Sequence, residues 1–205
     1  MAIGAILSDL DGTLVDSTDA VLRVWHGWMD DRGLRRTPPE EHPHGIPARE
    51  VVARLAPQLD ADRRPPSSSG ARSPTSTASS RCRVPRRCCD APARRPPVAV
   101  VTSCTLPLAR ARLRAAGLPQ PPAIVTAERT ARVKPHPDPY LLGAELLGVA
   151  PAACVVLEDA PAGIAAGRAA GMRVVAVRGR HVDERRLREA DEIVDDVAAF
   201  LARLP

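Results

Sequence analysis

Aromatic side chains are scarce in this chain of 205 residues, where they make up 2% of the sequence. Hydrophobic residues still account for 44%, so the core must be built from alanine, valine, leucine and isoleucine. No apolar run reaches about 18 residues, which excludes an ordinary transmembrane helix. The N-terminus lacks a basic stretch ahead of an apolar one. We therefore expect no signal peptide, no membrane partner and a cytoplasmic protein.

Cysteine pairs and metal-binding cysteine motifs are also missing. Of five cysteines, Cys88 and Cys89 are adjacent, and no CxxC spacing occurs. In a cytoplasmic protein this pattern predicts neither a disulfide framework nor a zinc site. His42 and His44 lie two apart, but the sequence offers no evident third ligand, so zinc is not expected there either.

Lysine is nearly absent as well. Lysine and arginine total 29, yet Lys134 is the single lysine. The abundance of alanine, arginine, proline and glycine is typical of a GC-rich gene, so excess arginine says little about function. A position that keeps lysine against this bias favours a compact ammonium group over a planar guanidinium.

The hydrophobic pattern predicts short strands and helices along most of the chain. Residues 3–8 are apolar and precede Asp9, which predicts a buried strand. Two helices are expected over 18–34 and 47–59. After residue 97, strands and helices are expected over 98–103, 106–118, 123–128, 138–149, 154–159, 161–172, 173–177 and 192–204.

Strands and helices that alternate at these lengths predict an α/β fold, a Rossmann-like parallel sheet with helices on both faces. Residues 1–16 and 98–205 would form this core. Residues 17–97 would be an inserted helical cap.

Residues 63–97 do not fit a packed cap. They contain nine arginines, seven prolines and seven serines, and Val84 is their one aliphatic residue beyond alanine. Such a composition predicts disorder. The alternatives are a flexible linker, an Arg/Ser-rich nucleic-acid-binding segment, or two compensating frameshifts. If TASSRCRVPRRCC over 77–89 is written in GC-rich codons and read one base earlier, it can become DGVVALPGAAAVL, which has the apolar pattern of a cap returning to the sheet.

Four short motifs follow predicted strands. Parallel strands bring their carboxyl ends to one edge of a sheet, where such sheets bind ligands. The first motif, DLDGTLVDS over 9–17, places Asp9 and Asp11 two residues apart, so both carboxylates are expected to point the same way into a crevice. Gly12 allows a tight turn. One carboxylate can act as a nucleophile and the other as a general acid/base.

The other three motifs supply groups that can bind phosphate and metal. VVTSCT over 100–105 offers hydroxyls at a strand end, VKPHPDPY carries Lys134, and VVLEDAPAGIAAGRAAGM over 155–172 offers the paired acids Glu158 and Asp159. Carboxylate oxygens suit a hard cation. Ordinary alternatives are a helix N-cap for the hydroxyls and for Asp159, and a surface position for Lys134.

In this order the four motifs resemble those of the haloacid dehalogenase superfamily of phosphotransferases. The resemblance covers 1–62 and 98–205, and within the superfamily it is closest to phosphatases of hexose phosphates, 2-deoxyglucose 6-phosphate and glycerol 3-phosphate. It implies a Mg²⁺-dependent phosphatase of a small phosphorylated metabolite, acting as a monomer or weak dimer without nucleic acid.

The resemblance also implies a role for each motif residue. Asp9 would form an aspartyl-phosphate, and Asp11 would protonate the leaving alcohol and then activate water. Mg²⁺ would be held by Asp9, the carbonyl of Asp11 and Asp159, with Glu158 directly or through water.

The remaining residues would bind the substrate. Thr102, Ser103 and Lys134 would bind the transferring phosphoryl oxygens. His44 and Gly45 lie in the segment that resembles the substrate-contacting cap loop. Their alternative is an ordinary exposed loop.

Two other activities stay open. The related beta-phosphoglucomutases carry a cap histidine ten residues after the second aspartate, where this chain has Val21; valine cannot move a proton, which favours hydrolysis. A non-catalytic nucleic-acid-binding protein that uses the Arg/Ser-rich insert is the other alternative.

Overall fold

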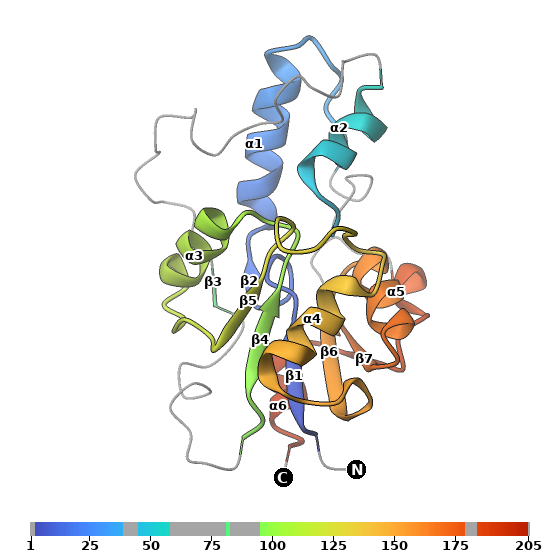
Figure 1. Ribbon diagram of the computed structural model, residues 1–205. Helices are drawn as coiled ribbons and strands as arrows, with labels where there is room; N and C mark the ends of the chain where they lie inside the picture. Colours follow the sequence, from blue (N-terminus) through green and yellow to red (C-terminus); the bar gives the residue numbers. More distant parts are fainter. Residues whose placement is uncertain (1–2, 39–44, 58–80, 83–94, 179–183, 205) are drawn as a thin grey trace.

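The computed structural model describes residues 3–38, 45–57, 81–82, 95–178 and 184–204. Its centre is a six-stranded sheet in the order β5-β4-β1-β6-β7-β8, in which every neighbouring pair is parallel (Figure 1). The strands are β1 (Ala5–Ser8), β4 (Val98–Val101), β5 (Ala123–Val125), β6 (Cys154–Glu158), β7 (Arg173–Val177) and β8 (Glu192–Val194).

Helices cover both faces of this sheet, as the alternating pattern predicted. One face packs against α4 (Asp138–Leu147) and α5 (Pro161–Ala169), and the other against α3 (Leu106–Ala115) and α6 (Val197–Leu201). Two short 3₁₀ turns, η3 (Pro151–Ala153) and η4 (Glu184–Leu187), lie in the connections. The parallel α/β sheet predicted from the sequence is therefore confirmed.

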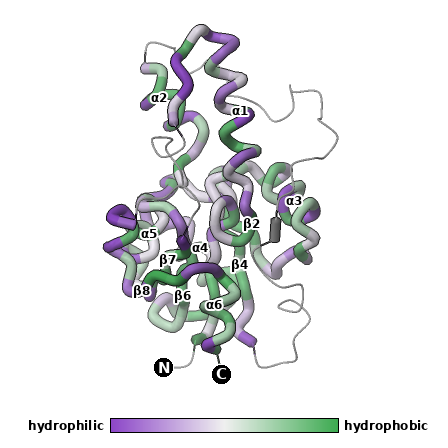
Figure 2. Tube along the Cα trace, turned by 180° about the vertical axis from the view of Figure 1, so that it is seen from behind, coloured by the Kyte–Doolittle hydropathy of each residue, from purple (hydrophilic) through white to green (hydrophobic). Residues whose placement is uncertain are grey.

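The central strands are apolar on both sides because both faces are covered. In β1, Ala5 and Leu7 belong to the core beside α4 and α5, whereas Ile6 belongs to the core beside α3 and α6. Figure 2 shows the strands as a green, hydrophobic centre. Tyr140 and Phe200 are the aromatic residues of these two cores, so the sheet is packed almost wholly with aliphatic side chains.

Two helices, α1 (Thr18–Asp30) and α2 (Ala48–Leu55), stand above the carboxyl edge of the sheet (Figure 1). They share a small core of their own, in which Trp25 and Trp28 meet edge to face at 5.5 Å. Both helices are shorter than predicted. After α1 the chain turns through Gly33, whose φ of +63° favours glycine, and returns a hydrogen bond from Leu34 to Met29.

A second, very small sheet was not predicted. Residues Val15–Asp16 (β2) pair antiparallel with Arg81–Cys82 (β3). Disorder throughout 63–97 was therefore wrong for residues 81–82, because backbone pairing with β2 needs no apolar side chains. Of the same segment, residues 95–97 are also described, and the rest lies outside the described residues. Within the part of the chain that is described, no helix is long and apolar enough to cross a membrane.

Candidate active site

Three central strands end beside one another and bring three of the sequence motifs together. Register pairs Ser8 of β1 with Leu157 of β6 on one side and with Val100 of β4 on the other. Asp9, Thr102 and Asp159, which each follow one of these strands, therefore meet at the carboxyl edge of the sheet. This edge is where an open parallel sheet changes its winding direction and binds ligands.

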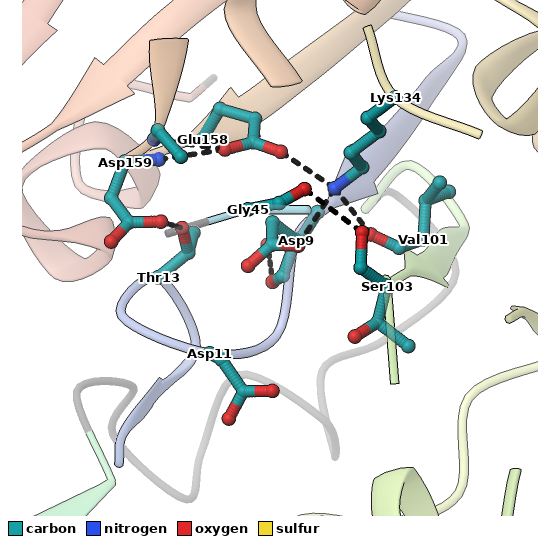
Figure 3. Close-up of polar contacts among 12 residues, drawn as sticks. Asp9, Asp11, Thr13, Gly45, Val101, Ser103, Lys134, Glu158 and Asp159 are labelled. Atoms are coloured by element: carbon teal, nitrogen blue, oxygen red, sulfur yellow. Dashed lines mark hydrogen bonds and ion pairs between the residues drawn. The ribbon is translucent and has the colours of Figure 1, made fainter. Parts of the chain in front are cut away.

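Lys134 lies at the centre of this group and is buried, with 1% of its surface exposed. Its ammonium donates to Asp9 Oδ1 at 2.7 Å, to the Val101 carbonyl at 2.9 Å and to Glu158 Oε1 at 2.6 Å (Figure 3). These acceptors use all three of its protons. Burial alone would lower the pKa of Lys134, but the charges of Asp9 and Glu158 outweigh it and raise that pKa well above its usual value.

Glu158 anchors this lysine. One carboxylate oxygen accepts from Lys134 and from the Tyr140 hydroxyl at 2.9 Å, and the other accepts from the backbone N–H groups of Asp159 and Ala160 at 3.0 Å. A carboxylate offers about four acceptor positions, so these four donors occupy the capacity of Glu158. Gly163 makes room for it, since a Cβ there would collide with the carboxylate.

The carboxylates of Asp9 and Asp159 are buried close to each other and repel one another when both are ionised. Burial raises the pKa of Asp9 to about 7, with Lys134 opposing the shift and Glu158 adding to it. Burial, followed by repulsion from Asp9 and Glu158, raises the pKa of Asp159 well above its usual value. Negative charge that is concentrated and poorly solvated in this way is relieved by a cation.

The three acids fit a metal ion. One carboxylate oxygen from each of Asp9, Glu158 and Asp159 lies within 4.8 Å of the others, and all three side chains are buried. An all-oxygen donor set is that of Mg²⁺, Ca²⁺ or Mn²⁺ rather than of zinc. Since the acceptor positions of Glu158 are taken, Asp9 and Asp159 are better placed to hold the ion directly.

The turn after Asp9 borders the same cluster of charged residues. Gly12 has φ of +91°, and a Cβ there would collide with the Asp159 carboxylate. Thr13 donates its hydroxyl to Asp159 Oδ1 at 3.2 Å. The turn predicted for DLDGT is thus present, and it also orients Asp159.

Asp11 does not join this group. Its carboxylate accepts from Ser17 Oγ at 2.5 Å and from Cys104 Sγ at 2.8 Å, and it forms an ion pair with Arg112 of α3. Figure 3 shows the Asp11 side chain pointing away from Asp9 and Lys134. The prediction that both carboxylates point the same way was wrong, because the partners of Asp11 lie on other elements, which the two-residue spacing could not reveal.

The hydroxyls after β4 have different partners. Thr102 is buried, and its Oγ1 accepts from the backbone N–H of Cys104 at 3.1 Å. Ser103 donates its hydroxyl to the carbonyl of Gly45 at 2.9 Å, which ties the end of β4 to the loop before α2. Gly45 has φ of +78°, and a Cβ there would press on Ala160. His44 lies outside the described residues.

An apolar cavity of about 330 Å³ lies between the sheet, α3 and α6. Its lining includes Ile6, Val100 and Leu157 of the central strands and Arg95 at the entry to β4. Asp9, Lys134 and Asp159 do not line it. This cavity is therefore separate from the cluster of charged residues.

Comparisons with known proteins place this geometry in a family. Residues 89–171 match the haloacid dehalogenase-like hydrolase family. The chain is 41% identical over 201 residues to hexitol phosphatase A of Escherichia coli, a match that covers 95% of this chain and 91% of that protein. The chain belongs to the haloacid dehalogenase-like hydrolases.

Two other proteins resemble the chain at lower identity. Glycerol-1-phosphate phosphohydrolase 2 of Saccharomyces cerevisiae is 31% identical over 192 residues, covering 86% of this chain and 75% of that protein. The crystal structure of a mutant of CbbY from Rhodobacter sphaeroides, in complex with xylulose-(1,5)bisphosphate, superposes with a TM-score of 0.79 at 27% identity. That match covers 98% of this chain and 99% of that one. The family resemblance seen in the sequence is confirmed.

Reasoning from the sequence missed several side chains of this hydrolase site, among them Thr13, Tyr140 and Arg112. Thr13 was inside a quoted motif but had no assigned role, Tyr140 was assigned only to a helix, and Arg112 was not singled out. Tyr140 carried a usable signal, because it is the single tyrosine of the chain, just as Lys134 is the single lysine. Arg112 carried none, because it is one of several arginines on its helix.

Proposed function

We propose that this haloacid dehalogenase-like hydrolase is a phosphatase that acts on a small sugar or polyol phosphate, its partner being a free metabolite rather than nucleic acid. The observation that carries the proposal is the buried contact of Lys134 with Asp9 beside a metal-binding set of acids. Support for the substrate class comes from the names of two relatives, hexitol phosphatase A and glycerol-1-phosphate phosphohydrolase 2.

In the proposed reaction Asp9 is the nucleophile. Its carboxylate attacks phosphorus, an aspartyl-phosphate forms, and the bond from phosphorus to the alcohol oxygen breaks. Asp11 gives a proton to that oxygen, takes a proton from the water that attacks the intermediate, and so completes the release of inorganic phosphate. Lys134 favours the ionised form of Asp9 and aims it, because its ammonium already donates to one Asp9 oxygen.

The acids would hold Mg²⁺. We propose Asp9 Oδ, the carbonyl of Asp11 and Asp159 as its protein ligands. Glu158, whose acceptor positions are occupied, would lie beside the ion without binding it directly. A bound cation offsets the repulsion between an anionic phosphate and the approaching carboxylate. Glu158 contributes mainly by fixing Lys134 and by accepting from the backbone at the start of α5.

The phosphoryl oxygens would be bound by fixed donors. We propose Thr102, the backbone N–H groups after β4 and Lys134 for this role, with the ammonium exchanging one of its three present acceptors for a phosphoryl oxygen. Donors of this kind are usually a large part of catalysis, and losing one costs about 10²–10³ in rate. Ser103 has a further role in this proposal, because its contact with Gly45 joins the site to the cap loop that carries His44 and contacts the substrate.

The test is hydrolysis of phosphorylated hexitols, glycerol phosphates and sugar phosphates by the purified full chain with Mg²⁺. We expect release of inorganic phosphate from one of these classes, its loss with EDTA and its return with excess Mg²⁺. If no phosphate is released while the folded chain binds nucleic acid in a salt-sensitive manner, the phosphatase proposal is wrong. Transfer of the phosphoryl group within the sugar, without its release, would instead show a mutase.

A further inference from the structure

The resting position of Asp11 is built from three separate parts of the chain. Ser17 precedes α1, Cys104 follows β4, and Arg112 projects from the second turn of α3. All three contact the same carboxylate. A side chain held by partners from three elements has a defined position rather than a free choice of rotamers.

Arg112 is the charged member of this set, and it is unusual for its helix. Its side chain is only 15% exposed, whereas Arg110 and Arg114 of the same helix lie on the surface. Burial lowers the pKa of Arg112 to about 10, and the charge of Asp9 opposes that shift, so the guanidinium stays positive at neutral pH. A largely buried charge needs a partner, and Asp11 is that partner.

This position is not one from which Asp11 can donate to a leaving group. The alcohol oxygen must lie across the phosphorus atom from Asp9, within the span of one phosphoryl group, and the Asp11 carboxylate points away from Asp9 (Figure 3). Asp11 must therefore turn toward the substrate before the first step. This turn breaks the ion pair with Arg112, so the ion pair favours the retracted position of Asp11 over the catalytic one.

We propose that Arg112 is a positioning residue that holds Asp11 in a retracted position and sets the fraction of enzyme that is ready to protonate the leaving alcohol. The inference rests on the proposed role of Asp11. A contact made only in the retracted state lowers the population of the competent state, and its removal raises that population by the same factor. Arg112 itself touches neither phosphate nor nucleophile in this scheme.

The discriminating measurement is a ratio of two activities. An alkyl phosphate such as glycerol phosphate needs a proton on its leaving oxygen, whereas p-nitrophenyl phosphate releases a phenolate that hardly needs one. We expect Arg112→Met to raise kcat/KM for the alkyl substrate relative to the aryl substrate by roughly three- to tenfold. Arg114→Met, on the exposed side of the same helix, should leave the ratio unchanged.

A second substitution of Arg112 keeps the test decisive. If Arg112→Met does not fold by circular dichroism, Arg112→Lys retains the charge with a shorter reach and should give a smaller rise in the same direction. A ratio that stays constant or falls in a folded Arg112 variant overturns the proposal.

The Asp11→Asn variant separates this proposal from the one on which it rests. It should lose far more alkyl than aryl activity, and adding Arg112→Met to it should bring no gain. Equal losses on both substrates would refute the general-acid role of Asp11. A selective loss combined with an unchanged ratio in Arg112→Met would refute only the retraction by Arg112.

Discussion

Lys134 and Asp9 form a buried ion pair, Nζ to Oδ1 at 2.7 Å, at the carboxyl edge of the central sheet. The same ammonium contacts Glu158 at 2.6 Å, so one lysine joins the end of β1 to the end of β6. This geometry explains why a chain rich in arginine keeps a lysine here. The enclosed space, with three acceptors around one nitrogen, suits a compact ammonium better than a planar guanidinium.

Replacing this lysine should therefore affect both activity and stability. Lys134→Met leaves two buried carboxylates without their cation, which should lower the free energy of unfolding by about 3–5 kcal/mol. Lys134→Arg should lose most of the phosphatase activity and, because the side chain is fully enclosed, part of the stability as well. Steady-state kinetics and chemical denaturation of both variants test this. A fully active Lys134→Arg enzyme would show that the ammonium is not required.

Metal binding should stabilise the protein more strongly as pH rises. The pKa of Asp9 is raised to about 7, and that of Asp159 is raised as well. The folded state thus keeps protons that the unfolded chain loses near pH 4, and without metal its stability falls as pH increases toward about 7. Mg²⁺ replaces those protons and offsets the repulsion between the ionised carboxylates of Asp9 and Asp159. We expect a larger rise in melting temperature with Mg²⁺ at pH 8 than at pH 6.

The control for this experiment is Asp159→Asn, which should show little rise at either pH. EDTA should reverse the effect in the unaltered chain. An equal rise at both values of pH would mean that the cation does not compete with protons on these carboxylates.

Gly163→Ala should damage the site without replacing any charged residue. The new Cβ collides with the Glu158 carboxylate, which must then shift and take Lys134 with it. We expect kcat to fall by roughly 10²-fold, as for other small misplacements of catalytic groups. Gly27→Ala is the matched control, since its Cβ meets open space on α1. That control should keep full activity and gain about 0.4–1 kcal/mol of stability.

The composition of 63–97 leads to a prediction about the gene. Two compensating frameshifts should appear when codons 60–100 are sequenced again. Residues 63–97 hold one aliphatic residue beyond alanine, Val84, whereas the shifted reading has the alternating apolar pattern that a packed segment needs. A chain in which residues 77–89 read DGVVALPGAAAVL should melt several degrees higher. An unshifted gene and an unchanged melting temperature would contradict this.

The fold could be predicted from the sequence because its signals are local and repeated. Short apolar runs that alternate with helical patterns indicated every strand of the large sheet. Carboxylates that directly follow those runs placed Asp9 and Asp159 at its edge. The pairing of β2 with β3 could not be foreseen, because each strand has two residues and no apolar period.

The sequence predicted which residues lie at the site but not how their side chains are oriented. Motif spacing brought Asp11, Ser103 and Glu158 to the sheet edge. It could not show that Asp11 turns toward Arg112, that Ser103 donates to Gly45, or that four donors surround Glu158. These contacts join residues far apart in sequence through side-chain rotamers, which depend on the packed structure.

The role of Asp9 as nucleophile is tested most directly by the steady-state phosphatase activity of Asp9→Asn with saturating Mg²⁺. Asparagine keeps the shape of the side chain and an oxygen that can accept from Lys134, so the variant should fold. It cannot form an aspartyl-phosphate, and we expect kcat to fall by at least about 10³-fold. Folded Asp9→Asn protein with activity within about tenfold of the unaltered enzyme would contradict the assignment.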